Sequence, residues 1–358
     1  MAHTPTLYAG IMTGTSLDAA DAVLCEGGSL TPIAHARAAI PSDVADTLRR
    51  MDESQTELAE VMDMANAVTR VCAKACESLP RSPEVIGCHG QTLLHRPERG
   101  WSLQLINGAL LAELTGADVI CDFRSRDIAA GGQGAPLAPL FHHAFFGDEN
   151  PRAVINLGGI ANISVLERDT VRGWDICPAN MLLDAWHHQH CGGAYDKDGS
   201  WAGGGEVIPE LLKELRAHPF LSLSPPKSCG REQFDLRHFQ AKFTPHPPQD
   251  VQATLLEWSA SVIAETVNAA DVKEVFLCGG GVRNTCLLSK ITAQTDIPVR
   301  LSDEVGITAE HVEAAAFAWL AREFVARRPI NTAPVTGATG AHILGALYPA
   351  GNDRPPAS

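Results

Sequence analysis

The chain has 358 residues, more than a single hydrophobic core usually supports, which predicts two domains. Hydrophobic residues make up 45% and charged residues 20%, a composition typical of globular proteins and not of disordered or fibrous ones. Lys and Arg number 28 against 42 Asp and Glu, a formal net charge of −14, which excludes a general nucleic-acid or anionic-membrane surface.

Short apolar runs alternate with longer helical patterns, which predicts an α/β fold. Residues 7–12 and 20–24 are expected to be strands around a turn of small polar residues, and therefore an antiparallel hairpin. Further along this half, the sequence predicts a helix over 53–77, a strand over 85–88, a helix over 109–114 and a strand over 119–122.

The opening pattern returns after the glycine-rich segment 129–136, which indicates two related halves. We expect one lobe of residues 1–131 plus about 335–358 and a second lobe of about 132–334. The second half is predicted to contain strands over 153–156 and 162–166, a helix over 250–268, a strand over 274–278, a helix from about Asn284 and an alanine-rich helix over 310–325.

Neither a secretory signal nor an apolar run near the ~20 residues of a membrane helix is visible. The ten cysteines are scattered and form no C-x-x-C pair. This pattern favours free thiols over disulfides, and hence a cytoplasmic protein.

Three glycine-rich turns follow predicted strands, at Gly14, at Gly158-Gly159 and at Gly279-Gly280-Gly281. Glycine lets the backbone approach a ligand closely, so that successive N–H groups can point at phosphate oxygens. One such turn is more often a plain connection, but three in an acidic chain favour a nucleotide site. The motif G-x-x-x-x-G-K-[ST] is absent, which excludes a P-loop, and no clean G-x-G-x-x-G supports a Rossmann site.

A series of motifs in unchanged order, from about Tyr8 to Pro349, resembles the anhydro-N-acetylmuramic acid kinases. No single motif is decisive, but the ordered set is specific. The motifs are Gly10–Asp18, Gly87–Thr92, Asp122–Asp127, Gly131–Leu137, Asn156–Asn162, Asn180–Trp186, Tyr195–Asp198, Pro226–Ser228, Asp250–Leu255, Cys278–Gly281, Glu313–Ala321 and Val335–Ala338.

This resemblance implies an actin- and hexokinase-like fold of two α/β lobes, with ATP and Mg²⁺ in the cleft between them. It also implies an enzyme that opens 1,6-anhydro-N-acetylmuramic acid and phosphorylates its 6-oxygen, giving N-acetylmuramic acid 6-phosphate in peptidoglycan recycling. The implied partner is this sugar, with no nucleic acid and no membrane, and a homodimer is left open. Two alternatives remain at this stage: a nucleotide-binding, actin-like interaction protein, and a kinase for another amino sugar or an open hydroxyl.

The resemblance implies that Asp175 is the catalytic base, on a loop, which activates water to attack the anomeric carbon. The competing interpretation is an N-cap for the helix expected near Asn180. The family's pattern after this aspartate is Thr-Gly-Pro-Gly-Asn, whereas Cys177 and Ala179 replace both glycines here. A left-handed backbone at either position would be strained.

The other implied site residues bind nucleotide, metal or sugar. Asp18 is the expected Mg²⁺ ligand, through water. For Glu313 the competing role is favourable charge in the first turn of a helix, and for Arg124 and Arg126 it is a solvated turn or salt bridges. The implied nucleotide-binding residues are Gly14, Thr15, Ser16, Leu17, Asp18, Ala19, Ala20, Asp21, Gly158, Gly159, Gly279, Gly280 and Gly281. The implied substrate-binding residues are Thr92, Arg124, Arg126, Asn180 and Glu313.

Overall fold

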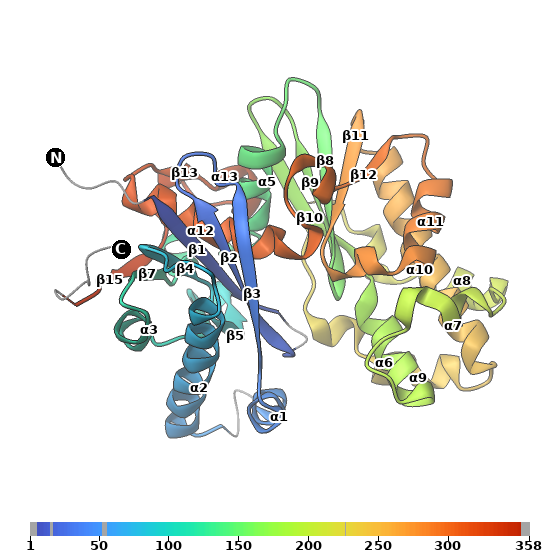
Figure 1. The fold of residues 1–358 in the computed structure, drawn as a ribbon. Helices are drawn as coiled ribbons and strands as arrows, with labels where there is room; N and C mark the ends of the chain where they lie inside the picture. Colours follow the sequence, from blue (N-terminus) through green and yellow to red (C-terminus); the bar gives the residue numbers. More distant parts are fainter. Residues whose placement is uncertain (1–5, 15–16, 52–55, 226, 352–358) are drawn as a thin grey trace. The chain divides into compact units, whose positions relative to one another are not determined.

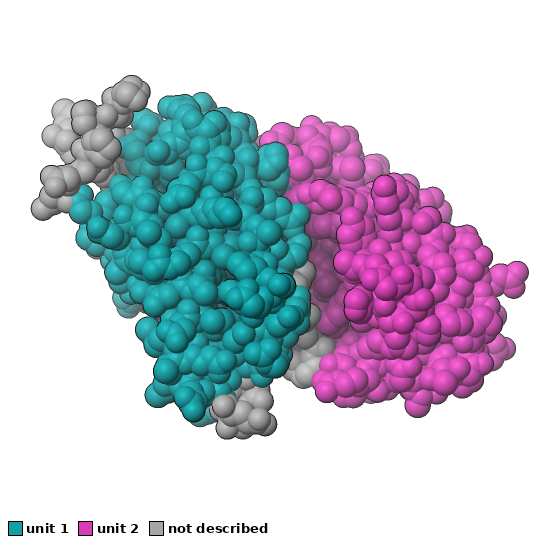
Figure 2. All heavy atoms as spheres, turned by 60° about the horizontal axis from the view of Figure 1, so that its bottom comes forward, with its two compact units in different colours: residues 1–141, 311–358 teal, residues 142–310 magenta. Residues whose placement is uncertain are grey.

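The computed structural model describes residues 6–14, 17–51, 56–225 and 227–351, in two compact units. Unit 1 comprises residues 1–141 and 311–358, and unit 2 comprises residues 142–310 (Figure 2). The sequence predicted boundaries near 131 and 334, whereas the units divide after residues 141 and 310. The second boundary differs more, because the helix over 312–325 packs against strands near the N-terminus and so belongs to unit 1.

Unit 1 is built on a six-stranded sheet with the order β15-β7-β4-β1-β2-β3 (Figure 1). Its strands are β1 (Leu7–Thr13), β2 (Ala19–Glu26), β3 (Pro32–Ala39), β4 (Val85–Cys88), β7 (Asp118–Cys121) and β15 (Ala346–Tyr348). β1 and β2 pair antiparallel, which confirms the first predicted hairpin, and β3 extends it antiparallel to β2. β4 and β7 continue the sheet parallel to β1.

Two long helices pack on the strands of unit 1, α2 (Leu58–Glu77) and α12 (Val312–Val325). α12 can approach β1 and β4 closely because Gly10 and Gly87 lie beneath it. A Cβ atom at Gly10 would overlap the carbonyl oxygen of Ala314, and one at Gly87 would overlap that of Phe317. Other α-helices and strands of this part of the chain are α1 (Ser42–Arg50), β5 (Gln91–Arg96), β6 (Trp101–Leu105), α3 (Gly108–Thr115), α4 (Ser125–Ala129), α5 (Ala138–Phe146), β13 (Ile330–Asn331), α13 (Ala333–Thr336) and β14 (Ala341–His342). Of these, α5 continues into unit 2.

Unit 2 is built on a five-stranded sheet with the order β10-β9-β8-β11-β12. The strands are β8 (Arg152–Leu157), β9 (Ile160–Leu166), β10 (Val171–Pro178), β11 (Glu274–Cys278) and β12 (Val299–Leu301). β8, β9 and β10 form an antiparallel meander, and β11 and β12 follow parallel to β8. Unit 1 has the same order and the same directions over β3-β2-β1-β4-β7, which confirms the two related α/β halves.

The core of unit 2 gathers around α10 (Pro248–Asn268), whose Trp258 is fully buried. Phe234 and Phe239 pack against this indole, and Phe220 packs against Phe234. The other α-helices of this unit are α6 (Asn180–Cys191), α7 (Ser200–Gly203), α8 (Pro209–Arg216), α9 (Leu236–Phe243) and α11 (Thr285–Ala293).

All ten cysteines are free thiols, as predicted. None of the helices in the described ranges combines the length and the apolar character that a membrane crossing requires.

Candidate active site

Asp175 lies within β10, the edge strand of the unit 2 sheet, and not on a loop as the sequence analysis expected. The pairing of β10 with β9 shifts register between Asp175 and Cys177. Asp175 does not cap α6, because the N-cap position is Ala179 and no side chain supplies a capping bond there. The capping interpretation is therefore wrong.

The Asp175 carboxyl group is held by a segment from farther along the chain. The backbone N–H of Asp175 donates to the carbonyl of Lys227 at 3.0 Å, and the N–H of Cys229 donates to Asp175 Oδ2 at 3.0 Å. Burial raises the pKa of Asp175 to about 6, although the Cys229 bonds and the Lys227 charge act to lower it. A carboxylate with this pKa is suited to take up a proton near neutral pH.

The two glycine replacements after Asp175 cause no left-handed strain. Neither Cys177 nor Ala179 has a positive φ, and Ala179 has φ −114°. Both side chains are buried, and Cys177 packs in the core of unit 2.

The start of α6 is attached to the turn between β8 and β9. The N–H of Asn180 donates to the Gly158 carbonyl at 3.1 Å, and the N–H of Ala179 donates to the Gly159 carbonyl at 2.9 Å. The Asn180 side chain donates to the carbonyls of Leu157, at 3.0 Å, and Gly158, at 2.9 Å. Asn180 therefore orients this turn through its carbonyls. Within the described residues, no hydrogen bond occupies the N–H groups of Gly158 and Gly159.

The triple glycine packs against the same turn. Gly279 has φ +84°, and a Cβ atom there would overlap the side chain of Asn156. A Cβ atom at Gly281 would lie 2.7 Å from the Leu157 carbonyl oxygen and 2.7 Å from Asn180 Nδ2. Unit 2 thus brings together two of the three predicted glycine-rich turns. At the neighbouring Gly280, by contrast, a Cβ atom would meet nothing within 4 Å.

The first glycine-rich turn lies in unit 1, where Thr15 and Ser16 fall outside the described residues. After it, Leu17 is buried with φ 57°, and its N–H donates to the Gly14 carbonyl at 3.3 Å. Ala19 and Ala20 are buried in β2.

The two acidic residues of this turn face a cation of the protein itself. The Arg37 guanidinium of β3 forms an ion pair with Asp18 and lies 3.5 Å from Asp21. No group of three or more His, Cys, Asp or Glu side chains in the described part of the chain is arranged to hold a metal ion. Asp18 thus pairs with Arg37 in this structure, and its expected role as a Mg²⁺ ligand through water stays a prediction.

A buried polar cluster forms in unit 1 around Arg124. Arg124 Nη1 donates to the Gly134 carbonyl at 2.7 Å, and Nη2 lies 2.8 Å from Nε2 of His89. Burial lowers the pKa of Arg124 to about 10, while the nearby Glu313 and Asp127 act to raise it. Arg124 and Glu313, both implied by the resemblance, are therefore electrostatic neighbours.

His89 was not among the residues predicted from the sequence. A polar residue directly after an apolar run and before a glycine is the signal that could have drawn attention to it, and the structure places His89 directly after β4 and before Gly90, which has φ 72°.

The other two implied sugar-site residues differ in their surroundings. Thr92 lies on β5, and its hydroxyl accepts from Gln104 Nε2 at 3.2 Å. Arg126 is exposed and lines a pocket of about 500 Å³ with Arg327 and His342, which includes neither Arg124 nor Glu313. Arg126 and Arg124 therefore lie in different environments, although only one residue stands between them in the sequence.

The family model for anhydro-N-acetylmuramic acid kinase matches residues 6–350. The chain is 46% identical to the anhydro-N-acetylmuramic acid kinase of Bordetella pertussis, over 97% of both chains. It is 44% identical to that of Pseudomonas paraeruginosa, over 96% of this chain and 99% of the relative. Among solved structures, a glucokinase from Streptomyces griseus in complex with glucose and AMPPNP matches with a TM-score of 0.43 at 15% identity, over 88% of this chain and 99% of that one.

Proposed function

This chain belongs to the anhydro-N-acetylmuramic acid kinase family and is a kinase, and on this premise we propose that its substrate is 1,6-anhydro-N-acetylmuramic acid. In the proposed reaction, water attacks the anomeric carbon and the bond from that carbon to the 6-oxygen breaks. The released 6-oxygen then takes the γ-phosphoryl group of ATP. The products are N-acetylmuramic acid 6-phosphate and ADP, in the recycling of peptidoglycan.

The observation that carries this proposal is the environment of Asp175. Its carboxyl group is held in place by the Cys229 N–H and has a pKa of about 6. At neutral pH it is mostly ionised, yet basic enough to accept a proton from water as the water attacks. An ordinary kinase for an open hydroxyl group has no need to activate water.

We propose that the glycine-rich turns of unit 2 bind the phosphates of ATP. Gly158 and Gly159 direct their carbonyls to the start of α6, which leaves their N–H groups for a ligand. Oriented backbone N–H groups of this kind form concave anion sites. In a chain with a net charge of −14, such local donors suit a polyanionic ligand.

In unit 1 we propose that Arg124, Thr92 and Glu313 bind the sugar. The Arg124 guanidinium offers a fixed cation for the lactyl carboxylate, because His89 and Gly134 hold it from two sides. Arg126 stays a weaker candidate, since it lines another pocket. Asp18, which pairs with Arg37, would hold Mg²⁺ through a water molecule, and no step is assigned to the ion. The ten free thiols support a cytoplasmic location.

The test is to incubate the protein with ATP and 1,6-anhydro-N-acetylmuramic acid in ¹⁸O-labelled water and to analyse the products by mass spectrometry. We expect a singly phosphorylated sugar that carries one ¹⁸O atom at the anomeric carbon. Phosphorylated sugar without the label would indicate a kinase for an open hydroxyl. ATP consumption that does not depend on the sugar would indicate the interaction-protein alternative.

A further inference from the structure

The segment Lys227–Cys229 covers the open edge of β10 at Asp175. It accepts a hydrogen bond from the Asp175 main chain, at the Lys227 carbonyl, and donates one to the Asp175 side chain, from the Cys229 N–H. The Cys229 sulfur atom also lies 3.8 Å from the same carboxyl oxygen. The backbone and the carboxyl group of Asp175 are therefore both held by this one segment.

The Lys227 side chain fixes this segment to the body of unit 2. Its Nζ atom donates to the carbonyls of Phe220, at 3.2 Å, and Leu221, at 3.3 Å. The ammonium group also lies 4.7 Å from the centre of the Phe220 ring, which is within the range of a cation–π interaction. Phe220 is itself buried, so the attachment point belongs to the packed core of unit 2.

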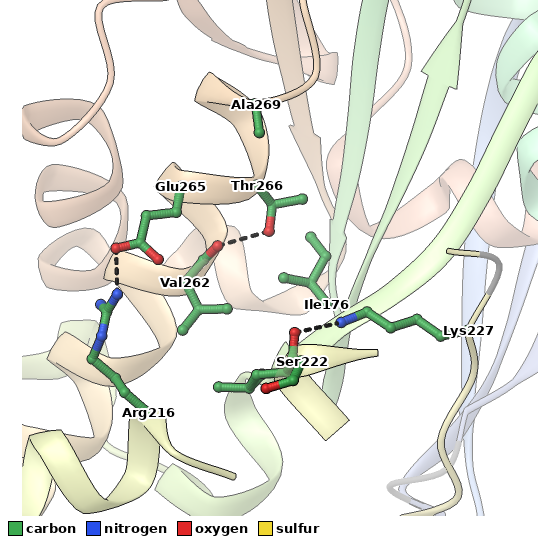
Figure 3. Close-up of a pocket in the computed structure, with 9 residues that line it drawn as sticks. Ile176, Arg216, Ser222, Lys227, Val262, Glu265, Thr266 and Ala269 are labelled. Carbon is green, nitrogen blue, oxygen red and sulfur yellow. Dashed lines mark hydrogen bonds and ion pairs between the residues drawn. The ribbon is translucent and has the colours of Figure 1, made fainter. Parts of the chain in front are cut away.

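A cavity of about 380 Å³ lies beside this attachment. Lys227 and Ile176, the residue after Asp175, share its lining with Arg216 and Glu265 (Figure 3). Figure 3 shows Lys227 directed toward the segment that carries Ser222. Because the lysine has open space on one side, packing alone does not fix its position, and the ammonium contacts supply the anchoring.

We propose that Lys227 is a positioning residue for Asp175: its ammonium group anchors the segment Lys227–Cys229, which in turn orients the Asp175 carboxylate. This inference rests on the proposed function, in which Asp175 is the base that activates water. Lys227 acts through Asp175 and through the Cys229 N–H, and it has no assigned contact with substrate.

Loss of the ammonium group has a defined electrostatic consequence. The titratable groups that act on the Asp175 carboxyl group are Cys229, by its two hydrogen bonds, and Lys227, by its charge, and both lower the Asp175 pKa. Cys177, on the same strand, is a buried thiol whose pKa is raised by burial, so it stays neutral. Removing the lysine charge and loosening the Cys229 bond should therefore both move the Asp175 pKa upward.

The experiment compares Lys227→Met, which keeps the length of the side chain, with Lys227→Arg, which keeps the charge and the donors. We expect Lys227→Met to lower kcat at least tenfold with little change in KM for the sugar. The acidic limb of its kcat profile should move to higher pH. Lys227→Arg should keep most of the wild-type kcat, and the acidic limb of its kcat profile should lie at the wild-type pH. Carbon-13 NMR titration of aspartate-labelled protein, with Asp175→Asn to assign the signal, should show the same upward pKa shift without any turnover.

Arg216→Met is the matched control, since Arg216 lines the same cavity but pairs with Glu265 and Ser261. It should keep the wild-type kcat and pH profile. An unchanged Asp175 pKa in Lys227→Met would overturn the inference. This holds if kcat is normal, and it also holds if kcat falls together with thermal stability, because a fall of that kind reflects a general loss of structure. If the wild-type protein does not phosphorylate the anhydro sugar, the proposed function fails, while the NMR titration still decides whether Lys227 positions Asp175.

Discussion

Nη2 of Arg124 lies 2.8 Å from Nε2 of His89. A guanidinium group only donates, so Nε2 must be the accepting nitrogen and the imidazole proton must sit on Nδ1. Nδ1 lies 2.7 Å from the carbonyl of Gly90, which accepts that proton. The pair thus requires a neutral histidine, and burial together with the Arg124 charge lowers the pKa of His89 to about 3.

The first prediction concerns this pair. His89→Leu removes the acceptor and leaves the buried Arg124 guanidinium short of a partner, which should destabilise the protein by about 2–3 kcal/mol. The KM for the sugar should rise as Arg124 loses its fixed position. Urea unfolding and steady-state kinetics measure the two effects. His188→Leu, at an exposed position on α6, is the control and should change neither. An unaltered KM in His89→Leu would remove Arg124 from the sugar site.

The second prediction concerns stability against pH. Burial lowers the pKa of His89 and of His142 to about 3, so the unfolded chain binds more protons at these sites below about 6.5 and stability falls as pH falls. Asp175 and Asp184 act in the opposite sense. Burial raises their pKa values to about 6 and about 7, with the Asp196 charge adding to the effect at Asp184. The folded state therefore binds more protons at the two aspartates.

The two aspartates should therefore offset part of the loss of stability that the histidines cause between about pH 6.5 and 4.5. Asp184→Asn removes one of the compensating groups. Its free energy of unfolding should then decrease toward acid more steeply than that of the wild type, by up to ~1.4 kcal/mol per pH unit. Urea unfolding at a series of pH values measures this. Parallel profiles for the variant and the wild type would contradict the assignment.

The third prediction tests the close approach of α12 to the sheet. Gly10→Ala places a methyl group where the Ala314 carbonyl lies, so the helix or the strand must shift. We expect a loss of about 3 kcal/mol or more. Gly28→Ala is the control, because a Cβ atom there meets nothing within 4 Å. Equal unfolding midpoints for the two variants would show that α12 does not pack as described.

The fourth prediction concerns the nucleotide. Asn180→Ala removes the two side-chain hydrogen bonds that orient the turn between β8 and β9. The Kd for a non-hydrolysable ATP analogue should rise about tenfold, which corresponds to ~1.4 kcal/mol. Calorimetric titration measures the affinity. Asn107→Ala, which removes the N-cap of α3 in unit 1, should lower stability without changing that Kd.

The sequence predicted the parts of the fold that have strong local patterns. The two hairpins, β4, β11 and the long helices follow from continuous apolar runs or helical spacing. β10 was missed because Gly173 and Pro178 break the pattern that predicts a strand, and Asp175 was therefore expected on a loop. β3 was missed because it carries mostly alanine and polar residues, which give a weak alternation.

In the candidate site, only residues that belong to the family's motifs could be predicted from the sequence. The motifs indicated Asp175, Arg124 and Glu313 as candidates, but not the groups that contact them. His89 precedes Arg124 by 35 residues, and the Cys229 N–H comes 54 residues after Asp175. Such pairs are made by the fold, and a single sequence contains no local signal for them. Asp18 is a similar case, because the structure places Arg37 beside it, a contact that the sequence did not indicate.

The last prediction concerns Asp175 itself. Asp175→Asn keeps an oxygen atom to accept from the Cys229 N–H, so the segment Lys227–Cys229 and the binding of both ligands should be retained. The amide cannot accept the proton of the attacking water, and kcat should fall by about 10²–10⁴-fold. In the wild-type protein, kcat/KM should rise with pH through about 6, because the base works only when ionised, and this limb should be absent in the variant. Steady-state kinetics between about pH 5 and 8 measure both effects, with sugar and nucleotide affinities determined separately. Turnover of Asp175→Asn at the wild-type rate would show that another group activates the water.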